Sequence, residues 1–137
     1  MDAGVAVEVP SDVFDAGVAE LFGEEAEPIS GVRAIRTPGH NADMCIVLID
    51  GGAGGKALFW ADLVPTTAHV PYPWIMGYDL YPLTTLENKK KWLPQAAAEG
   101  WLGVFEHDAD TPFARIIEDK AEDKPEGKPG RLRAAPA

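Results

Sequence analysis

Stretches of apolar residues separated by turn-forming residues run through the middle of the chain, and they predict β-strands. Ile29 to Arg36 form the first stretch, and Met44 to Asp50 form a second whose continuous apolarity predicts a strand buried on both faces. The glycine-rich residues 51–55 follow as a hairpin loop, with Lys56 to Trp60 as the returning strand. Two strands are therefore expected to pair around this loop.

The next part of the chain predicts a loop and then a helix. Residues 63–82 contain four prolines, which interrupt strand pairing and favour an ordered surface loop. Thr84 and Glu87 match a capping box, so a helix is expected from Thr84 to Gly100. Pro94 lies inside this helix and predicts a kink or break near Lys90.

Weaker patterns flank this central region. Strands are expected at Trp101 to Phe105 and at Phe113 to Ile117. The acidic residues 1–28 predict a short amphipathic helix, and residues 119–137 lack an apolar period, which predicts a disordered tail. The chain is thus expected to be an α/β protein with one domain over residues 29–118.

Composition limits the classes of partner. The 137 residues suffice for one domain with a modest core. Twenty-two acidic residues against 12 basic ones give a net charge of −10, which argues against nucleic acid or an anionic membrane and favours a small-molecule substrate. No apolar run is long enough for a membrane span, and no secretory leader is recognised, so the cytoplasm is the expected location.

Histidine or aspartate follows three of the predicted strands. His40 closes the turn after the first strand, Asp62 follows the returning strand, and His107 follows the strand that begins at Trp101. A lone histidine is more often a structural or surface residue, but the shared strand-end position of these three residues favours a metal site. Imidazole nitrogen and carboxylate oxygen are ligands that zinc, iron and manganese accept.

Three motifs, in this order, resemble those of the metallo-β-lactamase-fold hydrolases, and in particular their lactonase-like branch. The motifs are Thr37-Pro38-Gly39-His40, Phe59-Trp60-Ala61-Asp62 and Phe105-Glu106-His107-Asp108. They are similar to the family's TPGH turn, to the strand with its bridging aspartate and to the strand with its last histidine. Ala61 stands where the family usually has glycine. The resemblance covers residues 29–118 and implies half of an αββα sandwich, with a mixed sheet and one main helix.

The resemblance also implies a role for each residue. His40 would bind a first metal ion, Asp62 would bridge two ions, and His107 would bind the second. The implied cofactors are two divalent metal ions, zinc foremost, with iron or manganese as alternatives. A metal-bound hydroxide would hydrolyse a lactone, ester or amide. No further catalytic residue is assigned.

The family's other ligands come from a His-x-His-x-Asp-His motif upstream of the TPGH turn, and no histidine precedes His40 here. The resemblance is therefore to the carboxy-terminal half alone, which has too few ligands for a zinc site and predicts little or no metal binding or activity for this chain by itself. Three hypotheses stay open. The first is that the chain is part of a longer hydrolase whose amino-terminal half carries the missing ligands. The second is that another chain or a second copy supplies those ligands. The third is that the chain is a non-catalytic remnant that binds a partner without metal.

A few residues are candidates for lesser roles. His69 is expected either to contact substrate or the metal ligands, or to be a loop histidine bonded to the backbone. Tyr78, with Asp79 beside it, lines a pocket or packs within the loop. Asp43 supports the ligands as a hydrogen-bond acceptor or only caps the turn. The run Lys89 to Lys91 predicts a solvated helix face.

Overall fold

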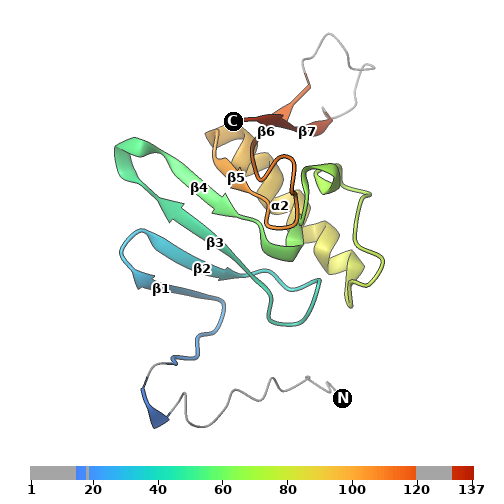
Figure 1. Ribbon diagram of the computed structural model, residues 1–137. Coiled ribbons are helices and arrows are strands. Elements are labelled where there is room, and N and C mark those ends of the chain that lie inside the picture. Colours follow the sequence, from blue (N-terminus) through green and yellow to red (C-terminus); the bar gives the residue numbers. More distant parts are fainter. Residues whose placement is uncertain (1–14, 18, 120–130) are drawn as a thin grey trace.

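The protein is built on one mixed β-sheet. The structure, a computed structural model, describes residues 15–17, 19–119 and 131–137. Within these residues seven strands lie in space in the order in which they follow one another in the chain (Figure 1). They are β1 (Glu25–Ile29), β2 (Val32–Arg36), β3 (Cys45–Asp50), β4 (Lys56–Phe59), β5 (Leu102–Val104), β6 (Phe113–Glu118) and β7 (Leu132–Pro136). The predicted α/β class is confirmed.

The first predicted strand is a hairpin in the structure. The sequence predicted one strand over Ile29 to Arg36, whereas β1 and β2 are separate strands that pair antiparallel. Gly31 makes the turn between them possible, because its φ is 81° and a Cβ there would lie 2.9 Å from the carbonyl oxygen of Asp50. The sheet therefore begins at Glu25, before the predicted domain boundary.

The two ends of the chain differ from their predictions where they are described. Part of the predicted amino-terminal helix falls on residues 11–14 and 18, outside the described residues, and Leu21 and Phe22 from its apolar face are exposed and not helical. The predicted disordered tail contains β7, which pairs antiparallel with β6 and buries Leu132. The tail prediction was wrong because backbone pairing with β6 orders a segment whose own apolar pattern is weak. Residues 120–130 lie outside the described residues.

The main helix, α2, spans Pro82–Glu99 and begins earlier than predicted. Its N-cap is Tyr81, which makes no side-chain cap hydrogen bond, so the predicted capping box does not form. Pro82 occupies the first turn, where its missing N–H costs nothing. Gly100 ends the helix with a φ of 66°, as predicted. The helix continues through Pro94, so no break occurs near Lys90.

The two faces of the sheet differ in burial. One face carries Ile46, Leu48 and Leu58, which form a core with Trp92, Leu93 and Ala96 of α2. The other face has a row of cross-strand neighbours that runs through Ala34, Val47, Phe59, Val104 and Phe113. The first four of these residues are half-buried, and Phe113 is 53% exposed. The prediction that the second apolar strand is buried on both faces was wrong, because α2 covers one face only (Figure 1).

A long connection joins β4 to α2. It contains the 3-10 turns η2 (Ala61–Leu63) and η3 (Thr67–His69), while η1 (Gly52–Gly54) lies in the hairpin between β3 and β4, as predicted for a loop there. Val64 and Val70 are fully buried and fasten this connection to the core. Across the described residues, no helix combines the length and apolar character that crossing a lipid bilayer requires.

Candidate metal site

Three of the predicted site residues converge at one edge of the sheet. β2 and β4 both run antiparallel to β3, and β5 runs parallel to β4, so β2, β4 and β5 share one direction. Their carboxyl ends therefore lie at the same edge. His40, Asp62 and His107 follow these three ends in turn.

Asp62 lies between the two histidines and turns one oxygen toward each. Its Oδ2 is 3.7 Å from Nε2 of His40, and its Oδ1 is 3.3 Å from Nε2 of His107. Two ligand atoms that are each about 2.0–2.1 Å from a tetrahedral zinc ion lie roughly 3.3 Å apart. Each imidazole–carboxylate pair thus has a spacing and a donor chemistry that fit one divalent ion, although each pair supplies only two donor atoms.

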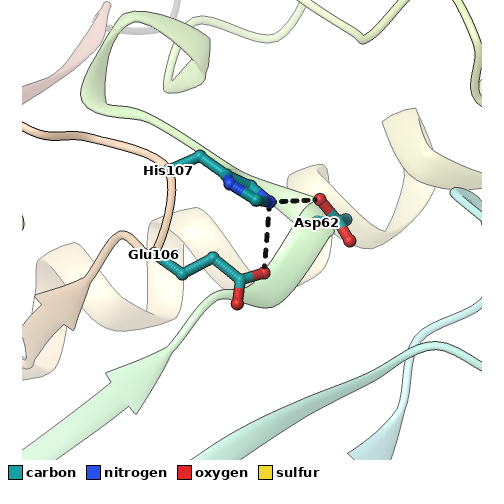
Figure 2. A group of neighbouring side chains, drawn as sticks. All are labelled: Asp62, Glu106 and His107. Atoms are coloured by element: carbon teal, nitrogen blue, oxygen red, sulfur yellow. Dashed lines mark ion pairs between the residues drawn. The ribbon is translucent and has the colours of Figure 1, made fainter.

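A further donor beside His107 was missed at the level of sequence. Glu106 Oε1 is 3.7 Å from His107 Nε2, and Asp62, Glu106 and His107 each place one donor atom within 4.8 Å of the others (Figure 2). Adjacent residues of a strand point to opposite faces, so a strand pattern does not group Glu106 with His107. In the structure β5 ends at Val104, and residues 106 and 107 form a turn that brings both side chains to the same side.

The residue before Asp62 has a backbone conformation that favours glycine. Ala61 has a φ of 46°, in the left-handed region where a Cβ costs about 1–2 kcal/mol. The family that the sequence resembles usually has glycine at this position, and the geometry gives a physical reason. Strain of this kind is often found at functional turns. Here it lies in the turn that brings Asp62 from β4 into the site.

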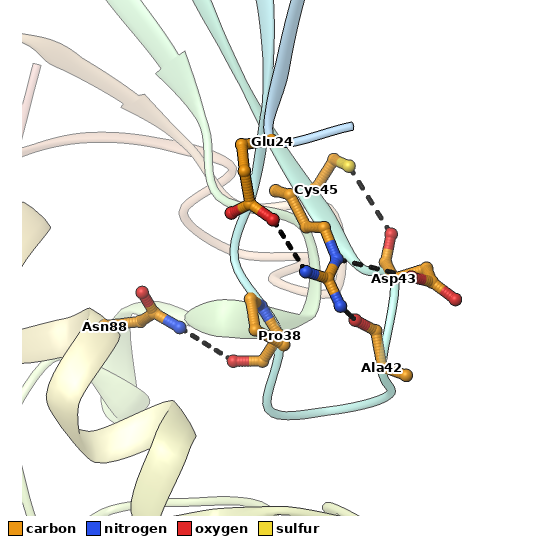
Figure 3. A network of polar contacts seen from close by, with 7 residues as sticks. Glu24, Pro38, Ala42, Asp43, Cys45 and Asn88 are labelled. Atoms are coloured by element: carbon orange, nitrogen blue, oxygen red, sulfur yellow. Dashed lines mark hydrogen bonds and ion pairs between the residues drawn. The ribbon is translucent and has the colours of Figure 1, made fainter. Parts of the chain in front are cut away.

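The turn that carries His40 is held against α2 and the residues before it. Tyr81 donates its backbone N–H to the carbonyl of Gly39 at 2.8 Å. Asn88 donates from Nδ2 to the carbonyl of Pro38 at 2.7 Å (Figure 3). The backbone of this turn is therefore fixed on the side of α2.

Two side chains contact the His40 ring from outside the ligand group. Asp79 Oδ1 lies 3.1 Å from Nδ1 of His40, and the Asp79 side chain is 0% exposed. Tyr78, which was predicted to line a pocket, meets the ring edge-on with 5.9 Å between ring centroids and is itself largely exposed. The His40 ring is 23% exposed between these neighbours.

Asp43, the other candidate on this turn, pairs with Arg36. Its Oδ1 accepts a hydrogen bond from Arg36 Nε at 3.3 Å. Arg36 also donates to the Glu24 carboxylate at 2.9 Å and to the Ala42 carbonyl at 2.8 Å. Figure 3 shows Asp43 and Glu24 in this cluster. The cluster connects the turn to Arg36 at the end of β2 and to Glu24 just before β1. The acceptor next to His40 is Asp79 instead.

Lys89 is fully buried, so the prediction of a solvated lysine run was wrong for this residue. Its Nζ donates to four loop carbonyl groups, those of His69, Pro71, Tyr72 and Trp74, at 2.6, 2.8, 3.4 and 2.8 Å. Burial lowers the pKa of Lys89 to about 8, opposed by Asp79, so the ammonium keeps its proton at neutral pH. The signal that was missed is helical spacing, because Lys89 lies one turn from the buried Thr85 and one turn from the buried Leu93.

His69 takes part in the loop through both its ring and its backbone. Its Nδ1 lies 2.8 Å from Thr66 Oγ1, and its carbonyl accepts from Lys89. Burial, and then the charge of Lys89, lower the pKa of the ring. The hydrogen bond is to a side chain and not to the backbone, and a contact of His69 with substrate stays a prediction.

The loop that carries His107 is fixed mainly by Asp108. Asp108 Oδ2 accepts from the backbone N–H and the hydroxyl of Thr67 at 2.9 and 2.6 Å, and Oδ1 accepts from the N–H of Thr111 at 2.8 Å. These hydrogen bonds, those of Thr67 foremost, lower the pKa of Asp108. The His107 backbone N–H donates to the Pro65 carbonyl at 3.1 Å, but the ring is 59% exposed.

Solved structures similar to this chain are hydrolases. No family model and no curated protein matches the chain. A probable metal-dependent hydrolase from Staphylococcus aureus is 28% identical with a TM-score of 0.70, over 73% of this chain and 36% of that one. AidC, a dizinc quorum-quenching lactonase, is 20% identical with a TM-score of 0.67, over 86% of this chain and 37% of that one.

A third structure covers still more of the chain. The hydrolase AbOPH of the beta-lactamase superfamily is 17% identical with a TM-score of 0.70, over 93% of this chain and 41% of that one. At such identities the similarity to AidC and AbOPH concerns the fold. The chain spans less than half the length of each of the three proteins.

Proposed function

We propose that His40, Asp62 and His107 form half of the metal site of a hydrolase, on the premise that the chain is part of a metallo-β-lactamase-fold domain, which the similarity of its fold to AbOPH supports. The observation that carries this proposal is the placement of Asp62, whose two oxygens face one imidazole nitrogen each at 3.7 and 3.3 Å. A carboxylate that bridges two cations needs this arrangement. The dizinc lactonase and the probable metal-dependent hydrolase among the similar structures support divalent ions, with zinc foremost.

The residues of the site have separate tasks in this proposal. Two divalent ions held there would acidify a water molecule and polarise a carbonyl group of the substrate. His40 and His107 each present one nitrogen, and Asp62 offsets part of the repulsion between the two positive charges. Glu106 adds a carboxylate on the side of His107. Lactones are the first substrates to test, followed by esters and amides, because lactonases are among the similar structures.

The half-site needs further ligands. Zinc sites normally use three or four protein ligands, and each ion would find one histidine and one shared carboxylate here. We assign the remaining ligands to a second sheet of the αββα sandwich, whether it belongs to a longer form of this protein, to another chain or to a second copy. The uncovered apolar face of the sheet, with Val47 and Phe59 near its middle, supports this assignment because such a face favours contact with another apolar layer.

Metal binding tests the half-site. The purified chain should bind zinc weakly in a calorimetric titration, and Asp62→Asn should abolish that binding. Asp43→Asn is the matched control, because it also removes a carboxylate from this edge of the sheet. Among the contacts described above, the Asp43 carboxylate pairs only with Arg36. Zinc binding that is unchanged in Asp62→Asn would sink the assignment of Asp62. Once the second sheet is present, zinc content should approach two ions per site and lactone hydrolysis should depend on Asp62.

The same apolar face supports a second candidate function, a partner-binding module that holds no metal. Under that alternative, Val47→Asp should abolish association in sedimentation experiments, whereas Asp62→Asn should leave it intact and the complex should contain no zinc. A complex that contains zinc and loses it with Asp62→Asn favours the hydrolase instead.

A further inference from the structure

Asp79 is a buried carboxylate whose two oxygens are both used. Oδ1 lies 3.1 Å from Nδ1 of His40, and Oδ2 accepts a hydrogen bond from the hydroxyl of Thr85 at 2.7 Å. The side chain of Asp79 is 0% exposed, and Thr85 lies buried in the first turns of α2. A buried carboxylate is costly unless donors satisfy it, so both contacts are needed to keep Asp79 in place.

The contact with Asp79 determines which nitrogen of a neutral His40 ring carries the hydrogen. We assign Nδ1 as the donor in this contact, because a carboxylate oxygen accepts hydrogen bonds and lies 3.1 Å from Nδ1. The hydrogen-free Nε2 then faces Asp62 Oδ2 at 3.7 Å, which is too long for a hydrogen bond. Two acceptors that face each other repel unless a cation lies between them. The ring is therefore arranged to present its lone pair to the place proposed for a metal ion.

The backbone of the His40 turn is held without the help of Asp79. Leu80 donates its N–H to the His40 carbonyl at 3.1 Å, and Asn88 fastens the turn at Pro38. A Cβ on Gly39 would lie 2.3 Å from Thr85 Oγ1, so the turn also packs tightly on α2. Loss of the Asp79 carboxylate should consequently change which nitrogen of the His40 ring carries the hydrogen and leave the backbone conformation of the turn intact.

We propose that Asp79 is a positioning residue that keeps neutral His40 in the Nδ1–H form and so presents Nε2 toward Asp62. Asp79 acts through His40 and touches neither metal nor substrate. The inference deepens the proposed function, but its central claim concerns the ring alone and holds for the protein without metal. Outer acceptors of this kind raise the affinity of a histidine ligand by fixing its orientation and hydrogen position.

Nuclear magnetic resonance of the metal-free chain tests the claim directly. The chain has three histidines, so a long-range proton–nitrogen correlation spectrum resolves three rings, and His40→Gln identifies the signal of interest. At pH 8 the wild-type His40 ring should carry its hydrogen on Nδ1. In Asp79→Ala the ring should shift toward the Nε2–H form that free histidine favours in water. A wild-type ring in the Nε2–H form overturns the proposal, whichever variants fold.

Three variants separate a positioning role from a merely structural one. Asp43→Ala removes a carboxylate at the other side of the same turn and should leave the His40 form unchanged. Asp79→Asn retains a carbonyl oxygen that can accept from Nδ1, so it should keep more of the Nδ1–H form than Asp79→Ala. Thr85→Val removes only the outer donor and should keep the Nδ1–H form. A shift of equal size in Asp43→Ala or Thr85→Val would contradict a specific role for Asp79.

Zinc titration then separates this inference from the proposed function. If both hold, Asp79→Ala should weaken zinc binding roughly 10–100-fold in the assembled site, with no change in Asp43→Ala. If the ring changes form as expected and the assembled protein still binds no zinc, the positioning role stands and the metal-site proposal fails. If zinc binds and Asp79→Ala changes neither the ring nor the affinity, the positioning role is overturned alone.

Discussion

His40 and His107 face the same carboxylate from opposite sides, but the protein supports them in different ways. The His40 ring is 23% exposed and has a buried acceptor, Asp79, behind it. The His107 ring is 59% exposed, and among the described residues the side chains within ion-pair distance are Asp62 and Glu106, both on the ligand side. One nitrogen is thus oriented in advance, whereas the other depends on the backbone of its loop.

Under the proposed function, this difference indicates on which side of the site the remaining ligands lie. A ligand with its own supporting acceptor costs little to organise when a metal ion binds. A ligand that lacks one must be ordered at the moment of binding, or by groups that arrive from a second layer of structure. We therefore expect the missing ligands and their supports to lie closer to His107 than to His40, and the following changes test the contrast.

The largest expected effect is on the loop that Lys89 holds, which lies between Asp62 and Asp79 in the chain. Lys89→Met would leave several buried carbonyl groups of the loop without a donor, each at a cost of about 1–3 kcal/mol. The variant should lose about 3 kcal/mol or more of unfolding free energy in urea titrations. Lys90→Met is the control, because Lys90 is exposed and pairs with Glu87 at the surface.

A similar loss of stability in both lysine variants would show that the buried ammonium has no special role. Unchanged hydrogen exchange of the loop amides near His69 in Lys89→Met would likewise contradict the assignment of Lys89 as the anchor of this loop.

The second effect is on the His107 side. Asp108→Ala removes the acceptor for Thr67 and Thr111 and should cost about 1–2 kcal/mol in unfolding free energy. The exposure of His107 should rise, which hydrogen exchange of residues 106–111 would report. Asp110→Ala, two positions away on the same loop, should change stability far less.

The contribution of Asp108 should also depend on pH in a defined direction. Hydrogen bonds lower its pKa in the folded protein below the ordinary value of 3.8, so the unfolded chain takes up its proton first as the pH falls. The stabilisation is present above pH 3.8 and is lost as the pH drops through the lower, folded value. The stability difference between the wild type and Asp108→Asn should therefore shrink with acidification in urea titrations; a difference that grows would refute the assignment.

A smaller effect should appear in chemical reactivity. The His107 ring should react with diethyl pyrocarbonate faster than the His40 ring, because its exposed fraction is more than twice as large. Peptide mass spectrometry after short exposures measures both rates in one sample. Equal rates would mean that the two rings are equally accessible in solution and would remove the contrast between them.

The smallest effect is expected at Ala61. Ala61→Gly relieves the strain of a Cβ at a positive φ, which costs about 1–2 kcal/mol. The same change removes a buried methyl group, which contributes about 0.8 kcal/mol, and increases the conformational entropy of the unfolded chain. Stability should change by about 1 kcal/mol or less. Ala61→Val, with a branched side chain at the same positive φ, should destabilise clearly, and thermal unfolding of both variants measures the difference.

The sequence predicted the parts of the site that coincide with breaks in apolar strands. His40, Asp62 and His107 each follow such a strand, and shared strand direction brings them together, so a local pattern was sufficient. The partners of Asp79 and Lys89 were beyond its reach, because they lie far along the chain, at His40 and in the loop of His69. Helical spacing with Thr85 and Leu93 could have indicated that Lys89 is buried, but not which groups it bonds. Long-range contacts of polar groups leave no periodic signal.

The same distinction holds for the fold. Strands with continuous apolar runs, β3 and β4, were predicted to within a residue or so, and the helix end was marked by Gly100. β1 and β7 were missed because few apolar side chains define them, and their order comes from backbone pairing with β2 and β6. Edge strands of this kind depend on a neighbour that the local sequence does not reveal.

The parallel pairing of β4 with β5 has a consequence for how such a protein can evolve. Asp62 and His107 follow adjacent strands that are paired side by side, with Phe59 opposite Val104. Pro65 and Thr67, early in the crossover between these strands, hold the loop of His107, whereas the exposed Trp74 and Tyr78 later in the crossover make no contact described above with Asp62 or His107. Insertions and substitutions around Trp74 and Tyr78 can therefore alter which molecules reach this edge while the spacing of Asp62 and His107 is inherited unchanged.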